Sequence, residues 1–254
     1  MDDMKTLSNK RVIISGASRG IGLAIAKKLA AEGASIAILA KTDKPHARLP
    51  GTVHTAAEEI EAAGGRALPI VTDIRSEDQV KVAVAQAAEV FGGIDCCINN
   101  ASAISLTPTV KTQMKRFDLM FDVNVRGTFL VTKECIPHLS KGINPHILNI
   151  SPPLDLDPKW FAPNVAYTMS KFGMSLCVLG MAMELKVLGI AVNALWPHSV
   201  IATAAISNVV GGKSTLGHCR TPEIMADAAA LILSKDAKNF SGNFCIDDVL
   251  LSDE

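Results

Sequence analysis

A tyrosine and a lysine stand four positions apart in the segment AYTMSK, at Tyr167 and Lys171. The residues around them have helical periodicity, and positions four apart on a helix lie on one face. A tyrosine has a pKa of about 10, and a cation beside it favours the phenolate. We therefore expect Lys171 to lower the Tyr167 pKa, so that the pair exchanges a proton with a carbonyl or alcohol oxygen. The alternative is that Tyr167 is an aromatic residue of an amphipathic helix with no chemical role.

A serine, Ser151, ends an apolar run sixteen positions before the tyrosine, and two prolines follow it directly. Its hydroxyl is the kind of group that holds a carbonyl oxygen beside a tyrosine–lysine pair. The neighbouring proline fixes its own φ and removes a donor, so the course of this loop is unusual. Ser151 is a catalytic candidate, and capping of a turn is an equally good interpretation.

A glycine-rich turn follows the first apolar run, in the sequence RVIISGASRGIGLAIAKKLAAEGA. Its GxxxGxG spacing lies between a predicted strand and a predicted helix, the context that a dinucleotide-binding turn needs. Glycines let the backbone approach a pyrophosphate, and the helix N-terminus offers free N–H groups. Glycine is also common in ordinary turns. We predict binding here by Gly16, Ser18, Arg19, Gly20, Ile21 and Gly22.

The end of the next apolar run indicates which nucleotide is used. NAD-selective sites place an Asp or Glu there to bind the ribose 2′-hydroxyl, but this chain has Ala40 and Lys41, with Asp43 beyond them. Lys41 and Arg19 would neutralise a 2′-phosphate, which predicts NADP(H). The alternative is that both are solvated surface cations.

Short apolar runs alternate with segments of helical period. This alternation is typical of βαβ units and a parallel α/β sheet in one domain, residues 1–254, because no linker divides the chain. The predicted strands are Arg11–Ser15, Ser35–Ala40, Ala67–Val71, Asp95–Asn99, His146–Ile150, Ile190–Leu195 and Asn243–Ile246. The predicted helices are Ile21–Ala31, Thr55–Ala63, Glu77–Val90, Met114–Thr132, Val165–Val187 and Pro222–Leu233.

Composition narrows the partners and the compartment. Lysine plus arginine and aspartate plus glutamate both number 25, so nothing favours nucleic acid or an anionic membrane. No apolar run is long enough to span a bilayer, and the polar N-terminus lacks a secretory signal. The six cysteines have no CxxC spacing, so neither a metal nor a redox motif is indicated. We expect a cytoplasmic protein without a bound metal.

Taken together, these motifs resemble the short-chain dehydrogenase/reductase family. The resemblance runs almost end to end, through the glycine turn, Asp73, Asn99-Asn100-Ala101-Ser102, Asn124, the Tyr167–Lys171 pair and Trp196-Pro197. It implies a doubly wound, seven-stranded parallel Rossmann sheet and a nicotinamide-dependent oxidoreductase. It also implies site roles: adenine contact by Asp73, nucleotide contacts by Asn100, Ala101 and Pro197, carboxamide binding by Thr203, ribose binding by Lys171, and a water held by Asn124.

The chain departs from the family pattern at three places. Pro152 stands where the family has its substrate-orienting serine, so either Ser151 takes over that role or another donor does. His198 replaces the glycine of the family's Pro-Gly turn, where it would contact ligand or lie in solvent. The family's C-terminal Asp-Gly-Gly is here Ile246-Asp247-Asp248, which puts a family tetramer contact in doubt.

The surroundings of the predicted site indicate a substrate class. Ala103, Ile104, Leu154, Trp160 and Phe161 are apolar, which suits an apolar ketone or alcohol of acyl or sterol-like type. Surplus apolar surface on the helices Met114–Thr132 and Val165–Val187 predicts a homodimer or homotetramer. The leading hypothesis is an NADP(H)-dependent oxidoreductase. The alternative is a nucleotide-binding sensor or scaffold with little turnover.

Overall fold

The computed structural model describes residues 7–45, 50–204, 206 and 219–253. Two predicted strands have the predicted bounds, and the other five differ by one residue at one or both ends. The elements follow one another as β1 (Arg11–Ser15), α1 (Gly20–Ala31), β2 (Ser35–Ala40), α2 (Val53–Ala62), β3 (Arg66–Val71), α3 (Glu77–Phe91), β4 (Cys96–Asn99), α4 (Met114–Met120), α5 (Thr128–Leu139), β5 (His146–Asn149), α6 (Val165–Glu184), β6 (Ala191–Trp196), α9 (Glu223–Ser234), β7 (Phe244–Ile246) and α10 (Asp247–Ser252).

The seven strands form one parallel sheet in the order β3-β2-β1-β4-β5-β6-β7. The chain winds outward from β1 to β3, then returns to place β4 on the other side of β1. In open parallel sheets, ligands bind at the carboxyl ends of the strands where the winding direction changes. The glycine turn after β1 and Asn100 after β4 meet at this point. The predicted doubly wound α/β fold is confirmed.

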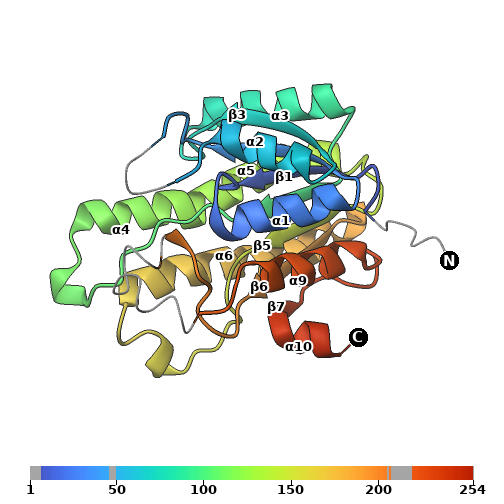
Figure 1. Cartoon of the computed structure of the whole chain (residues 1–254). Helices are drawn as coiled ribbons and strands as arrows, with labels where there is room; N and C mark the ends of the chain where they lie inside the picture. Colours follow the sequence, from blue (N-terminus) through green and yellow to red (C-terminus); the bar gives the residue numbers. More distant parts are fainter. Residues whose placement is uncertain (1–6, 46–49, 205, 207–218, 254) are drawn as a thin grey trace.

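Helices cover both faces of the sheet (Figure 1). Helices α1, α2 and α9 enclose one apolar core with the strands, and α3, α5 and α6 enclose the other. Strand residues such as Ile13, Ile38 and Ile98 are fully buried. This burial on both faces explains why the strands read as nearly continuous apolar runs.

The prediction of one regular α-helix over Met114–Thr132 is wrong, because this range contains a π-helical segment. Helix α4 passes into a π-helical segment, Phe121–Gly127, before α5 begins. Such wide turns insert an extra residue into the helix and occur often at functional sites. Here the π segment carries Asn124, which is fully buried.

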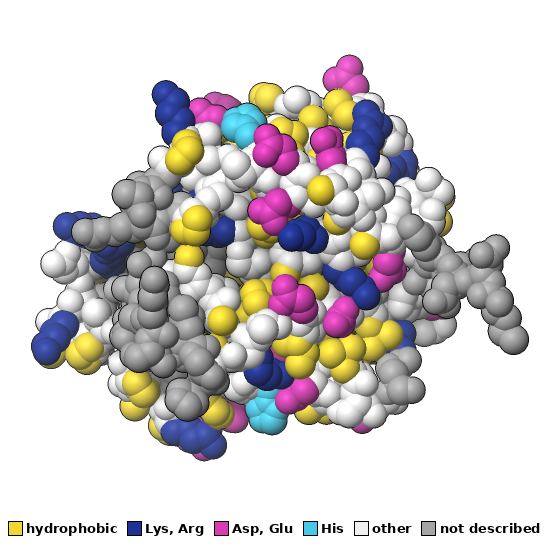
Figure 2. Space-filling model, in the orientation of Figure 1, with side chains coloured by type: hydrophobic (Ala, Val, Ile, Leu, Met, Phe, Trp, Pro, Cys, Tyr) yellow, Lys and Arg dark blue, Asp and Glu magenta, His cyan; other side chains and the backbone are white. Residues whose placement is uncertain are grey.

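On the face drawn in Figure 2, acidic and basic side chains are interspersed, as expected from equal numbers of both charges. Among the residues that the structure describes, no helix is both long enough and apolar enough to cross a bilayer.

Candidate active site

The glycine turn leaves its backbone open to a close ligand. Gly16 adopts φ +73° and Gly20 φ +58°, conformations that favour glycine. A Cβ at Gly16 would lie 2.6 Å from the Cα of Ala101, where no side chain fits. Helix α1 begins at Gly20, so its first amide groups have no partner within the helix. The turn therefore fits the pyrophosphate of a dinucleotide.

Asn100 supports this turn from β4. Its Nδ2 donates to the carbonyls of Ser15 (3.1 Å) and Gly16 (3.0 Å). The Ser15 hydroxyl in return accepts from the backbone amides of Asn100 and Ala101, both at 3.2 Å. The side-chain amide of Asn100, a predicted nucleotide-binding residue, thus binds the protein backbone and helps to hold the glycine turn in its conformation.

Arg19 contacts the loop between β2 and α2. Its Nε donates to the carbonyl of Pro50 (2.8 Å), and its terminal amine donates to that of Gly51 (2.7 Å). The sequence assigned this guanidinium to a 2′-phosphate, which stays a prediction; in the structure two of its donor groups bind the loop. Ser18 is buried in the turn, and Ile21 packs against the apolar core that α1, α2 and α9 enclose.

The adenosine end of the predicted site has a charged rim. Asp73 forms an ion pair with Arg75 at 2.6 Å. The Arg75 guanidinium chiefly, with a smaller contribution from Lys41, holds the pKa of Asp73 below its usual value. Lys41 is exposed at the end of β2, and Asp43 is paired with His54 at 2.8 Å. Lys41 and Asp73, which follow the carboxyl ends of β2 and β3, are therefore close enough for their charges to interact.

Tyr167 and Lys171 lie one turn apart on α6, as predicted. Lys171 is buried, and its Nζ donates to the carbonyl of Ile150 at 2.6 Å. It also lies 3.0 Å from Met174 Sδ and 5.3 Å from the ring centre of Trp196. An apolar sulfur, an aromatic face and one carbonyl replace the water that an ammonium group prefers.

Burial sets the protonation of both groups. It raises the pKa of Tyr167 to about 12 and lowers the pKa of Lys171 to about 7. The prediction that Lys171 lowers the Tyr167 pKa is therefore wrong, because loss of water disfavours the charged form of each group. At neutral pH the phenol carries its proton.

Asn124 links the π segment to α6. Its Oδ1 accepts from the amide of Ala103 (2.7 Å), and its Nδ2 donates to the Ala103 carbonyl (3.0 Å) and to Ser170 Oγ (2.9 Å). Ser170 Oγ in turn donates to the carbonyl of Tyr167 at 2.8 Å. Sequence reasoning missed Ser170, although it directly precedes Lys171.

Ser151 directly follows Ile150, whose carbonyl accepts from Lys171 Nζ. Its side chain is fully buried, and its Oγ has no hydrogen-bond partner within the described residues. The next residue is held as well, because Ser175 Oγ donates to the carbonyl of Pro152 at 2.6 Å. The Ser151 hydroxyl forms no hydrogen bond with Lys171 or Tyr167, and the catalytic role predicted for Ser151 stays a prediction. Ser175, four positions after Lys171, is a further residue that sequence reasoning missed.

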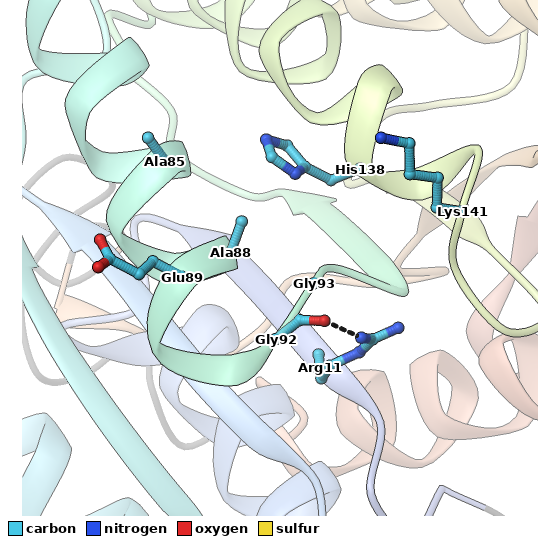
Figure 3. A pocket seen from close by; sticks show the side chains of 8 residues that line it. All are labelled: Arg11, Ala85, Ala88, Glu89, Gly92, Gly93, His138 and Lys141. Atoms are coloured by element: carbon cyan, nitrogen blue, oxygen red, sulfur yellow. Dashed lines mark hydrogen bonds between the residues drawn. The ribbon is translucent and has the colours of Figure 1, made fainter.

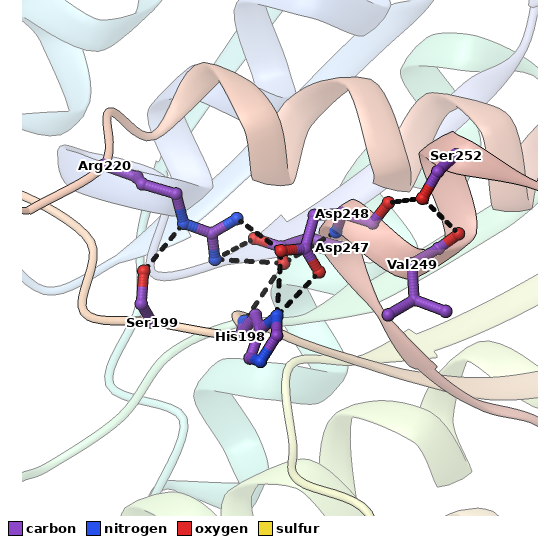
Figure 4. A network of polar contacts seen from close by, with 7 residues as sticks. All are labelled: His198, Ser199, Arg220, Asp247, Asp248, Val249 and Ser252. Atoms are coloured by element: carbon purple, nitrogen blue, oxygen red, sulfur yellow. Dashed lines mark hydrogen bonds and ion pairs between the residues drawn. The ribbon is translucent and has the colours of Figure 1, made fainter.

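The segment after β6 passes over the glycine turn. A Cβ at Gly20 would lie 3.4 Å from Thr203 Cγ2, so Thr203 stands beside the predicted pyrophosphate position. Pro197, which starts the segment, is half-buried. His198 points away toward α10, where its Nδ1 lies 2.8 Å from Asp248 (Figure 4). The imidazole ring of His198 is therefore paired with a carboxylate of this chain.

Comparisons with known proteins agree with this geometry. Residues 10–213 match the family model of short chain dehydrogenases. The chain is 56% identical over 248 residues to Hydroxysteroid dehydrogenase-like protein 2 of Xenopus tropicalis, covering 98% of this chain and 59% of the relative. It thus spans about half to three-fifths of the length of the curated relatives it matches.

Solved structures of short-chain dehydrogenases also resemble this chain. A short-chain dehydrogenase from Mycobacterium thermoresistibile superimposes with a TM-score of 0.92 at 53% identity, covering 97% of this chain and 88% of that one. A short-chain dehydrogenase from Burkholderia cenocepacia in complex with NADP gives 0.80 at 27% identity, with 95% and 97% covered. This chain belongs to the short-chain dehydrogenase family of oxidoreductases.

Proposed function

We propose that this chain is an NADP(H)-dependent oxidoreductase that acts on an apolar ketone or alcohol of acyl or sterol-like type. The observation that carries the proposal is the Tyr167–Lys171 pair on α6, whose buried lysine contacts Ile150 and Trp196 at the carboxyl ends of β5 and β6. A phenol that stays protonated at neutral pH is suited to donate its proton to the alkoxide that forms during carbonyl reduction.

Each residue of the site has a defined task in this proposal. The dinucleotide, when bound on the glycine turn, supplies or accepts the hydride. Tyr167 gives its proton to the substrate oxygen, and Lys171 Nζ, with a pKa of about 7, returns a proton to the phenolate. Asn124 and Ser170 hold the first turn of α6 through their hydrogen bonds, which keeps the Tyr167 backbone in place.

The substrate class rests on the loops around Tyr167. Phe161 packs on Phe172 of α6 at 4.8 Å between ring centres, and Trp160 is exposed with its Nε1 donating to Asp155 at 2.7 Å. Apolar and aromatic surface of this kind favours an apolar substrate. The test is NADPH oxidation by the purified protein over a panel of apolar ketones and 3-oxoacyl thioesters. Turnover of a panel member supports the proposal.

NADP(H) is proposed because the end of β2 offers Lys41 and no carboxylate. Lys41→Asp should lower the preference for NADPH over NADH by about 10- to 100-fold, since it exchanges attraction of the 2′-phosphate for repulsion. Dissociation constants for both nucleotides, measured by calorimetry, check this. Lys141→Asp, an exposed charge change elsewhere on the surface, is the control. An unchanged ratio in Lys41→Asp contradicts the assignment.

A nucleotide-binding sensor or scaffold is the second candidate. Pro152 favours it, because proline has no hydroxyl to offer a carbonyl oxygen where the family has its substrate-orienting serine. This candidate predicts tight NADPH binding with no oxidation across the whole panel. Efficient reduction of any panel member rejects it.

We also propose that α6 joins two copies of the chain. Met169, Leu176, Leu179 and Met183 are exposed along one stripe of α6, and Phe129 of the neighbouring helix α5 is also exposed. A contiguous apolar stripe of this length is typical of an interface between subunits. We propose a second copy of the chain as the partner, because a two-fold symmetric contact would cover the α6 stripes of both copies at once.

Leu176→Glu and Leu179→Glu together should convert the dimer to a monomer, because charges would be buried without partners in the interface. Light scattering coupled to gel filtration measures the mass. Val82→Glu, at an equally exposed valine of α3, is the control and should leave the mass unchanged. A native protein that is already monomeric at micromolar concentration contradicts the proposal.

A further inference from the structure

Arg220 lies where the chain returns beside the segment that leads to Thr203. Its backbone amide donates to the carbonyl of Val200 at 3.1 Å, and its carbonyl accepts from the amide of Ala202 at 2.8 Å. Ile201, between these two residues, is buried in the core that α1 and α9 share. The backbone of Arg220 therefore fixes the segment just before it crosses the glycine turn.

The side chain of Arg220 reaches a buried carboxylate. Its guanidinium lies 2.9 Å from Asp247 of α10, whose side chain is 0% exposed. Asp247 also accepts from the backbone amides of His198 (3.0 Å) and Asp248 (2.8 Å). One carboxylate thus joins the end of β6, the returning chain and the start of α10 (Figure 4).

The outer part of this cluster is exposed. Arg220 Nε donates to Ser199 Oγ at 2.8 Å, and His198 pairs with Asp248. Exposed pairs contribute little to stability. Removing one partner of a buried pair is costly, because it leaves a charge without water or a counterion. The Arg220–Asp247 pair is therefore the part of the cluster that holds the segment.

We propose that Arg220 and Asp247 are positioning residues for dinucleotide binding, which act by holding the segment Pro197–Thr203 over the glycine turn. The inference rests on the proposed function, because its functional readout is nucleotide affinity. Thr203 is the link, since it lies against Gly20, where α1 begins. If the pair is broken, the segment spends less time in its binding position and the apparent affinity falls by the same factor.

A second buried pair supplies a matched control. Arg11 lies 2.6 Å from Asp95, with side-chain exposures of 21% and 2%, against 27% and 0% for Arg220 and Asp247. Asp95 likewise accepts from two backbone amides, those of Arg11 and Ile143. This pair lies at the amino ends of β1 and β4, the end of the sheet away from the glycine turn. Arg11 lines the cavity of about 410 Å³ in Figure 3. Loss of the pair should cost stability without touching the nucleotide site.

The experiment compares Arg220→Met with Arg11→Met. Both variants should melt at lower temperature than the native protein. Only Arg220→Met should weaken NADPH binding in calorimetry, by about tenfold if the segment is correctly placed a tenth of the time. Arg220→Lys should restore part of the affinity, because it keeps the charge. Equal loss of affinity in Arg11→Met and Arg220→Met, or no loss in either, overturns the proposal.

Hydrogen exchange separates this inference from the proposed function. In Arg220→Met, the amides of residues 198–203 should exchange faster while those of β1 and α1 keep their native rates. Unchanged exchange at 198–203 overturns the inference by itself. A native protein that binds no NADPH rejects the proposed function, and the exchange rates still decide whether the pair holds the segment.

Discussion

Replacement of Tyr167 by phenylalanine is expected to lower kcat for carbonyl reduction by about 10²- to 10⁴-fold, the usual contribution of a general acid. Tyr167 is the only tyrosine of the chain, and the Ser151 hydroxyl has no hydrogen-bond partner within the described residues. Neither neighbour of Tyr167 in the sequence carries a phenol or an acid that could replace it. The loss should appear in kcat and leave NADPH affinity within about twofold, because the glycine turn is untouched.

The control for this variant is Thr168→Val, which removes a hydroxyl from the adjacent position. Thr168 Oγ1 donates to the carbonyl of Trp160 at 2.8 Å, so its loss should alter a loop contact and leave most of the turnover. Steady-state NADPH oxidation measures both variants on the best panel substrate. Full activity in Tyr167→Phe would remove the proton-transfer role and with it the proposed mechanism.

Lys171→Met is expected to abolish turnover and yet make the folded protein more stable at neutral pH. Burial lowers the Lys171 pKa to about 7 in the folded protein, whereas an unfolded lysine has a pKa of about 10.4. Between these values the unfolded chain holds a proton that the folded chain has released, so native stability rises with pH across this window. The shift corresponds to roughly 4 kcal/mol at pH 7, offset by about 1 kcal/mol for the lost bond to Ile150.

The methionine variant lacks this titration. Its advantage should therefore be greatest at pH 7 and below, and should close as the pH approaches about 10.4. Chemical denaturation at several pH values measures the free energy of unfolding of both proteins. Lys186→Met, at an exposed lysine beyond the end of α6, is the control and should follow the native curve. Parallel curves for Lys171→Met and the native protein would contradict the deep burial of the amine.

Under the proposed function, the burial of Lys171 would give the site its reactivity and also lower the stability of the fold. A lysine with a pKa near the working pH can both hold and release a proton. That property comes from the same burial by Met174 and Trp196 that makes the charged form unfavourable in the fold. Loss of stability at a functional position is a common compromise in enzymes.

The sequence by itself determined the parts of the protein that depend on neighbours along the chain. The alternation of apolar runs predicted the parallel sheet, with β1 and β2 at their observed bounds. The four-residue spacing placed Tyr167 and Lys171 on one helix face, and the glycine spacing predicted the turn at Gly16. Each of these follows from the local geometry of helices, strands and turns, which a few consecutive residues fix.

Only the tertiary structure decided which groups meet and how much water they keep. Arg19 contacts Pro50 and Gly51, some thirty positions later, and Asp247 joins His198 to Arg220. Spacing alone suggested that Lys171 lowers the Tyr167 pKa, but packing removes water from the phenol, and the pKa of Tyr167 rises instead. The physical reason is that burial and partners depend on residues far apart in the chain, and the loss of water that follows outweighs local spacing in setting the charge of a side chain.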